Sequence, residues 1–164
     1  MVSFMVIDRE ILPLFININH KALLTIDKAA LTYTDVGYSK NAETLIIHFE
    51  PLQPLSVEDM KQCCKLLENW LEAFKYTANI DSCERILISG RIPLIMLLQL
   101  VWTIRKAYIE GLRDIDRELP HVYVFDPKLG EAVNSEGKTV TIPDELKAKL
   151  LGGYLEEAKK IGIV

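Results

Sequence analysis

The chain has 164 residues, of which 49% are hydrophobic and 26% are charged, a composition typical of one folded domain and not of a disordered chain. Its 19 basic and 23 acidic residues give a net charge of −4, which argues against non-specific binding of duplex DNA through bulk charge. The three cysteines fit neither a disulfide framework nor a metal-ligand spacing, and no signal-peptide pattern is present, so we expect buried thiols and a cytoplasmic location.

The first 43 residues predict a β-rich N-terminal extension. Three segments in it are rich in β-branched residues and carry no helical period: Val2–Ile7, Leu12–Asn19 and Ala22–Val36. A polar run, residues 37–41, then marks a boundary. We therefore expect residues 1–43 to form an extension and residues 44–164 to form the core with a C-terminal helix, within one compact domain overall.

From residue 44 the pattern alternates between short apolar strands and amphipathic helices. The expected order is a strand at Thr44–Glu50, a helix from Val57 to about Tyr76, a strand at Arg85–Ser89, a helix from Pro93 to about Glu110 and a strand at His121–Phe125. Such alternation favours parallel strands joined by right-handed crossovers. The sequence therefore predicts an α/β fold with a Rossmann-like, mainly parallel sheet and flanking helices. A helix-covered antiparallel sheet is the alternative.

The second of these helices is unusually apolar. It contains the longest apolar run of the chain, Ile92–Ile104, which only two polar residues interrupt. A membrane-spanning helix needs about 20 such residues, and Arg91 and Arg105 flank this run closely. We therefore expect no membrane partner, and a helix that is buried on most of its sides with Met96 and Trp102 in the core.

The last part of the chain predicts a hairpin and a helix. Residues Glu131–Ile142 contain the turn sequence Asn134–Gly137 between two short strands. Pro143 is tolerated in the first turn of a helix. The segment that it opens has the pattern of an amphipathic helix, with five apolar residues on one face: Leu146, Leu150, Leu151, Leu155 and Ala158.

Polar residues follow three of the expected strands: His48–Glu50, Ser89–Arg91 and Asp126–Gly130. The carboxyl ends of parallel strands meet at one edge of a sheet, where ligands bind. Gly90 would let a ligand approach the backbone, the helix after it would offer free N–H groups, and Arg91 would bind a phosphate. Ser89, Gly90 and Arg91 are therefore candidate ligand-binding residues. The alternative is that Gly90 only turns the chain and Arg91 pairs with Asp126.

The third segment has the composition of an Asx turn, which is the interpretation that turn chemistry favours. The functional alternative is that Asp126 orients a nucleophile or holds a divalent cation while Lys128 meets a phosphate. A histidine base for Asp126 is missing from the local sequence. His48 lies inside an apolar strand, as core histidines do, and His121 would face the opposite side of its strand.

Two segments together resemble the Csx-three family of CRISPR-associated ring nucleases: Ile86–Pro93 and, across a helix, Val122–Val133. The strand Thr44–Glu50 followed by Pro54 is similar to that family's opening strand and turn. The similarity covers about residues 44–134. It implies a Rossmann-like nucleotide-binding core and a homodimer. It also implies binding of cyclic tetra-adenylate, the second messenger of type III CRISPR defence, which such proteins cleave with manganese.

The resemblance also implies particular site residues. The family's catalytic aspartate falls on Asp126, which would hold the metal, and its following arginine falls on Lys128, which would contact phosphate. The family's catalytic histidine has no counterpart, because residues 102–106 have the sequence Trp-Thr-Ile-Arg-Lys. In that segment Arg105 or Lys106 would stabilise negative charge, but either is a poor proton acceptor at neutral pH. The catalytic candidates are thus Asp126, Lys128 and Arg105.

We therefore expect a homodimeric protein that binds cyclic tetra-adenylate at its sheet edge, and the missing histidine leaves the cleavage step open. In a cleaving protein, a ribose 2′-hydroxyl would attack the adjacent phosphate in line, with Arg91 and Lys128 offsetting the developing charge. Two alternatives belong to other classes: an interaction or oligomerisation module without chemistry, and a nuclease that acts on the ends of short RNA.

Overall fold

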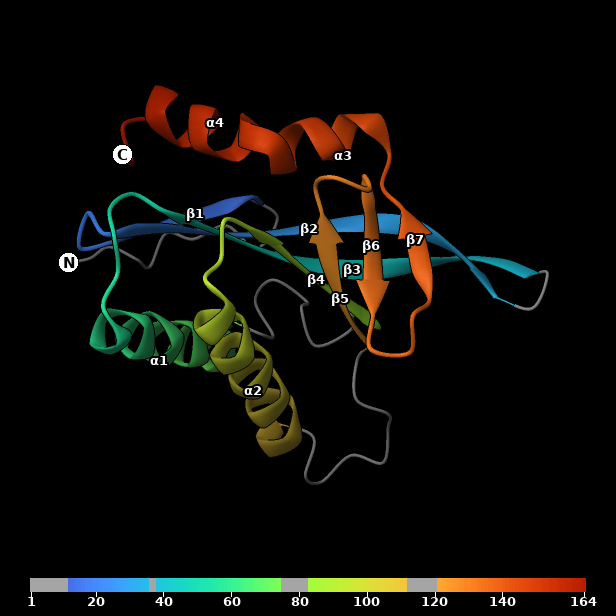
Figure 1. The fold of residues 1–164 in the computed structure, drawn as a ribbon, viewed down its shortest axis with the longest axis horizontal. Coiled ribbons are helices and arrows are strands. Elements are labelled where there is room, and N and C mark those ends of the chain that lie inside the picture. The colour runs from blue at the N-terminus through green and yellow to red at the C-terminus, as the bar shows by residue number, and fades with distance from the viewer. Residues whose placement is uncertain (1–11, 36–37, 75–82, 112–120) are drawn as a thin grey trace.

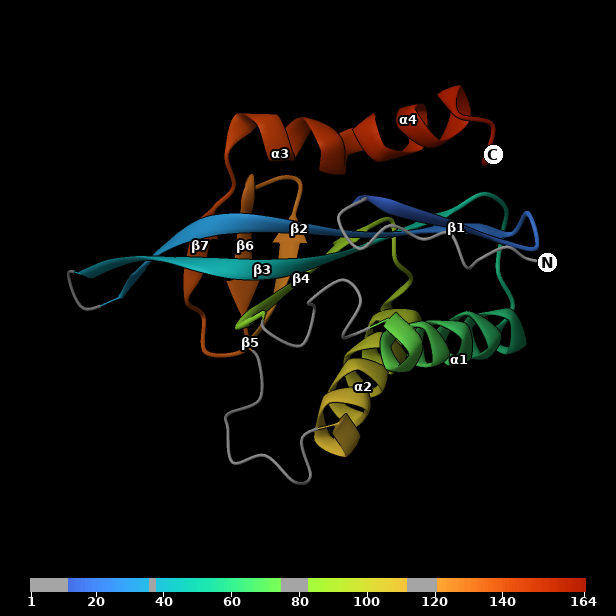
Figure 2. The same cartoon turned by 180° about the vertical axis from the view of Figure 1, so that it is seen from behind.

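The computed structural model describes residues 12–35, 38–74, 83–111 and 121–164, so the expected strand Val2–Ile7 lies outside the described residues. The strands are β1 (Leu14–Ile18), β2 (Ala22–Asp35), β3 (Tyr38–Pro51), β4 (Arg85–Gly90), β5 (His121–Asp126), β6 (Glu131–Asn134) and β7 (Thr139–Thr141). The helices are α1 (Val57–Phe74), α2 (Leu94–Gly111), α3 (Asp144–Ala148) and α4 (Tyr154–Lys160), with a kinked turn at Lys149–Gly153 before the last. α1 and α2 lie on one face of the sheet, and α3 and α4 on the other (Figure 1 and Figure 2).

The described strands form one seven-stranded sheet in their chain order, β1 to β7. β3 pairs parallel with β4 and β4 with β5, whereas the other four pairings are antiparallel. The α/β class is confirmed, but the sheet is mixed and not mainly parallel. The reason is connection length. Helical crossovers join the parallel neighbours, whereas a short turn such as residues 127–130 reverses the chain and makes its strands antiparallel.

β3 crosses the boundary that the sequence suggests after residue 43, and it pairs with β2. They pair along all 14 residues of each strand, so residues 43 and 44 both lie inside β3. The polar residues that suggested a boundary, such as Asn41, are exposed at one end of this strand pair. Exposure at the end of a long pair of strands therefore accounts for their polarity.

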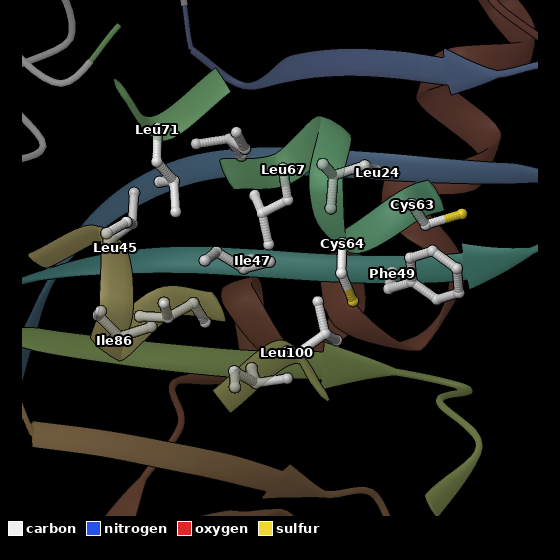
Figure 3. Close-up of a cluster of buried hydrophobic side chains, with 14 of the residues drawn as sticks. Leu24, Leu45, Ile47, Phe49, Cys63, Cys64, Leu67, Leu71, Ile86 and Leu100 are labelled. Carbon is white, nitrogen blue, oxygen red and sulfur yellow. The ribbon is translucent and has the colours of Figure 1, made fainter. Parts of the chain in front are cut away.

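The face of the sheet under α1 and α2 carries a large apolar core (Figure 3). Alternation along β3 turns Leu45, Ile47 and Phe49 toward these helices, and all three are buried. The three-and-four spacing of α1 supplies the side chains that meet them: Met60, Cys63, Cys64, Leu67 and Leu71. The three cysteines are buried thiols, as expected, and burial raises the pKa of the Cys63 thiol to about 11.

α2 is buried on one side, and the expectation that most of it is enclosed is wrong. Met96, as predicted, is buried and packs in the core with Leu100 and Ile104. Trp102, predicted to be in the core, is 69% exposed. Three further apolar residues of the helix are also exposed: Leu94, Ile95 and Leu98. The apolar residues of α2 therefore lie on two sides of the helix: one side packs against α1 and the sheet, and the other is exposed. In the described ranges, no helix is both long and apolar enough to span a membrane.

The C-terminal helical segment covers the other face of the sheet. Side chains at spacings of four are buried beneath it: Leu146, Leu150, Tyr154 and Ala158. Leu151, which the sequence pattern assigned to the same face, is 56% exposed. The reason is a kink: the backbone leaves helical geometry at Leu151 and at Gly152, whose φ is 127°. Tyr154, four residues after the buried Leu150, faces the sheet beyond this break.

Tyr154 links this segment to β2. Its hydroxyl donates a 2.7 Å hydrogen bond to Asp27 Oδ2, and both residues are buried. Burial and the Asp27 carboxylate raise the pKa of Tyr154. A Tyr154→Phe variant removes this donor from a buried carboxylate, so we expect the free energy of unfolding, measured by urea titration, to fall by about 1–3 kcal/mol. Tyr38→Phe, at an exposed position, is the control, and an equal loss in both variants would show that the hydrogen bond is unimportant.

Candidate functional site

The carboxyl ends of β3, β4 and β5 surround one pocket of about 420 Å³, which we call the edge pocket. It is lined by Glu50 from β3, Ser89–Arg91 from β4, and Phe125 and Pro127 from the end of β5. The kinked turn and the start of α4 contribute its other wall. The structure thus brings together parts of all three segments that the sequence assigned to this edge, as the parallel pairing of these strands requires.

Gly90 lies where β4 leaves the sheet, with a φ of 115° that favours glycine. A Cβ at this residue would lie 1.8 Å from the carbonyl oxygen of Phe49. The close approach that glycine permits is therefore an approach to β3 of the same chain. Its role in turning the chain, the simpler of the two sequence interpretations, accounts for this glycine without a ligand.

Arg91 pairs with Glu50 and not with Asp126, the partner that the sequence suggested. Its Nε donates a 2.5 Å hydrogen bond to Glu50 Oε2. The arginine side chain is 75% exposed and the glutamate side chain 8% exposed. This bond uses one of the five N–H donors of a guanidinium. The terminal nitrogens of Arg91 are therefore available to a ligand at the mouth of the edge pocket.

His48 lies behind these two residues and is 1% exposed. A 3.2 Å hydrogen bond joins its Nδ1 to Ser89 Oγ. Its Nε2 lies 3.5 Å from Glu50 Oε1, a long polar contact, and this nitrogen makes no well-formed hydrogen bond in the described part of the chain. Ser89, His48, Glu50 and Arg91 thus form a continuous polar row on the face of the sheet that α3 and α4 cover. The expectation of a hydrogen-bonded core histidine matches this position.

Glu50 is the site residue whose importance the sequence reasoning missed. The sequence pattern gives it only as the end of a strand at the sheet edge, with no role of its own. Two features of the sequence point to a role for Glu50. His48 and Glu50 are two residues apart, so strand alternation puts them on one face. A carboxylate that ends an otherwise apolar strand also needs a partner when it is buried, and Arg91 supplies it.

The His48 ring first, and then the Arg91 guanidinium, hold the pKa of Glu50 below its ordinary value in spite of its burial. A carboxyl group with a lower pKa in the folded state contributes stability that is complete above the unfolded pKa and lost as the pH falls through the folded pKa. We therefore expect the unfolding free energy of the wild type to fall more steeply from about pH 5 to pH 3 than that of Glu50→Gln.

Urea titrations across this pH range measure the effect, and Glu145→Gln, at an exposed position of α3, is the control. The account is wrong if Glu50→Gln keeps the full acid dependence of the wild type.

Asp126 ends β5, and Lys128 lies in the turn that follows. Asp126 Oδ1 accepts hydrogen bonds from the backbone N–H groups of Lys128 at 2.8 Å and Leu129 at 3.3 Å, which makes this an Asx turn. Phe125 packs in the core under α3 and α4, so alternation turns Asp126 toward the other face of the sheet. Pro127 lines the edge pocket, whereas Asp126 and Lys128 are not among its described lining residues.

Arg105 lies outside the edge pocket. It lines a separate groove of about 480 Å³ between α2, β5 and the turn after β6, together with His121 and Val124. Asp126, two residues beyond Val124 at the end of β5, is not among the described residues that line this groove. Arg105 and Asp126 therefore share neither this groove nor the edge pocket.

The described residues also bear on the manganese that the resemblance implies. Among them, no three histidine, cysteine, aspartate or glutamate side chains gather into a group that could hold a metal ion. Asp126 offers one carboxylate, of which one oxygen already accepts two backbone hydrogen bonds. No step of the proposed function therefore depends on manganese.

Comparison of the chain with protein-family models, curated proteins and solved structures finds no match. The protein is a mixed α/β protein with a pocket at the carboxyl ends of its three parallel strands, and polar residues of the sheet line part of this pocket. The resemblance carried by the two sequence segments is the remaining guide to what this pocket binds.

Proposed function

We propose that this chain binds cyclic tetra-adenylate at the edge pocket, as part of type III CRISPR defence. The observation that carries the proposal is that Arg91 from one half of the paired motif and Pro127 from the other line the same pocket. We propose further that the unit β3–α1–β4–α2–β5, with its two parallel pairings, is the Rossmann-like nucleotide-binding core that the resemblance implies.

Arg91 is the proposed phosphate contact. Its bond to Glu50 holds the guanidinium in place, while the terminal N–H donors have the fork geometry that suits a phosphate. α2 begins three residues later, and its first turn contains no acidic side chain that would repel an anion. Lys128, exposed in the turn after β5, is the proposed second contact.

The proposal covers binding and not cleavage. The chain has three histidines. His20 bonds to Asn17 in the turn after β1, His48 is buried on the face of the sheet opposite to the Asp126 side chain, and His121 begins the strand that Asp126 ends. None of the three histidines is placed beside Asp126, where it could act as a general base.

A gel-shift assay with labelled cyclic tetra-adenylate tests this function. We expect a shifted band that contains the intact ring, with and without manganese. Linear tetra-adenylate and a short RNA should compete more weakly than the unlabelled ring. Equal competition by the linear molecules would favour the RNA-end alternative, and the absence of any shift would remove the proposal.

We propose that the exposed apolar side of α2 forms a homodimer interface. Leu94, Leu98 and Trp102 recur on it at spacings of four, and contiguous apolar patches mark contact surfaces. We expect the wild type to sediment at twice the chain mass of 18.7 kDa, and Trp102→Glu, which puts a charge in the interface, to sediment as a monomer. Gln62→Glu, at an exposed position of α1, is the control. A monomeric wild type would rule this interface out.

A further inference from the structure

The edge pocket has two chemically different parts. Apolar side chains line most of it: Leu151 and Leu155 from the C-terminal segment, and Phe125 and Pro127 from the end of β5. Its polar part is the Glu50 carboxylate and the Ser89 hydroxyl on the sheet, with Arg91 beside Glu50. Apolar walls with a few placed polar groups are the form of a site for a small organic group, and about 420 Å³ is ample for one heteroaromatic ring.

The carboxylate decides which ring fits. The Glu50 side chain is 8% exposed and its pKa is lowered, so it is ionised at neutral pH and can only accept hydrogen bonds. A carboxylate has about four acceptor positions. Arg91 Nε occupies one of them on Oε2, and Oε1 has the longer 3.5 Å contact to His48. Acceptor capacity therefore remains, and it suits a ring that carries N–H donors. A phosphate oxygen in the same place would be repelled.

We infer that the edge pocket holds one adenine ring of the ligand, with its exocyclic amino group directed at Glu50 and its faces against the apolar walls. The inference rests on the proposed function and deepens it, because it assigns Arg91 to phosphate and the pocket to a base. It also gives a role to Leu151 and Leu155, which lie outside the residues 44–134 that the resemblance covers. The kink that turns Leu151 out of the core makes it part of this wall.

Replacing adenine by unsubstituted purine tests the inference, because purine has a hydrogen atom where adenine has its amino group and offers no other donor at that edge. We expect the full-length wild type to bind cyclic tetra-adenylate on the order of tenfold or more tightly than the cyclic tetranucleotide of purine riboside, since the buried carboxylate then loses its donor. Glu50→Gln, whose amide oxygen is a weaker acceptor than a carboxylate, should bind these two cyclic tetranucleotides with a smaller difference. Leu151→Ser, at an exposed position, should weaken adenine-ring binding several-fold while the melting temperature stays unchanged.

The outcomes separate this inference from the function beneath it. A wild type that binds both cyclic tetranucleotides equally would overturn the assignment of the pocket to a base, but the binding of the cyclic ligand would still stand. Failure to bind either cyclic tetranucleotide would remove the proposed function itself. If a folded Glu50→Gln variant loses affinity for both rings by the same factor, Glu50 acts through Arg91, and the inference is wrong. Unchanged binding in Leu151→Ser would likewise exclude the proposed wall.

Discussion

A Gly90→Ala variant is expected to lose about 3 kcal/mol or more of unfolding free energy. Its Cβ would lie 1.8 Å from the Phe49 carbonyl oxygen, so the two backbones must move apart. Phe49 is buried under α1, and such a movement disturbs the core as well as the turn. Alanine would also have to keep a φ of 115°, which side chains disfavour. Urea titration followed by circular dichroism measures the loss.

Gly137→Ala is the matched control for this experiment. Gly137 has a φ of 82°, but a Cβ there would meet no atom within 4 Å. Its substitution by alanine carries only the conformational penalty of a positive φ, about 1 kcal/mol, and no clash. Equal destabilisation of the two variants would mean that the approach of β4 to Phe49 is not what requires glycine.

Arg91→Ala is expected to weaken the binding of cyclic tetra-adenylate by about tenfold to a hundredfold, as the loss of a bidentate charged hydrogen bond to phosphate does. Arg105→Ala is the matched control, because it removes the same charge from a separate groove that does not include the residues of the edge pocket. Fluorescence titration with a labelled ring compares the three proteins. An equal loss in both variants would show that only the overall charge matters.

The Arg91 experiment needs one further variant, because alanine also leaves the buried Glu50 carboxylate without its partner and destabilises the chain. Arg91→Lys keeps the charge near Glu50 but lacks the planar fork. We expect this variant to regain most of the thermal stability and only part of the ring affinity. Full recovery of affinity with lysine would argue against a bidentate phosphate contact.

The elements of the fold could be read from the sequence where local patterns decide them. The apolar run Thr44–Glu50 and the three-and-four spacing after Val57 fall inside β3 and α1. Short strands do not carry their pairing partners in their own sequence, so the antiparallel share of the sheet was underestimated. Leu151 and Trp102 were misplaced for a related reason: a helical pattern gives the face of a straight helix, but not a kink or the number of sides that neighbours cover.

The candidate site, like the fold, could be predicted from the sequence only in part. The meeting of Arg91 and Pro127 could be predicted, because parallel strands end at one edge whatever their side chains are. The partner of Arg91 could not, since Glu50 and Asp126 both end neighbouring strands and differ only in the face to which each side chain turns. The apolar wall from the C-terminal segment depends on the kink at Gly152 and was not foreseen.

Titration of cyclic tetra-adenylate into the folded wild type, followed by calorimetry in the absence of divalent cations, tests the central claim most directly. We predict saturable binding with a dissociation constant of about 10 µM or lower, as a specific ligand site requires. A chain that remains folded and shows no binding at ring concentrations of about 100 µM would contradict the account.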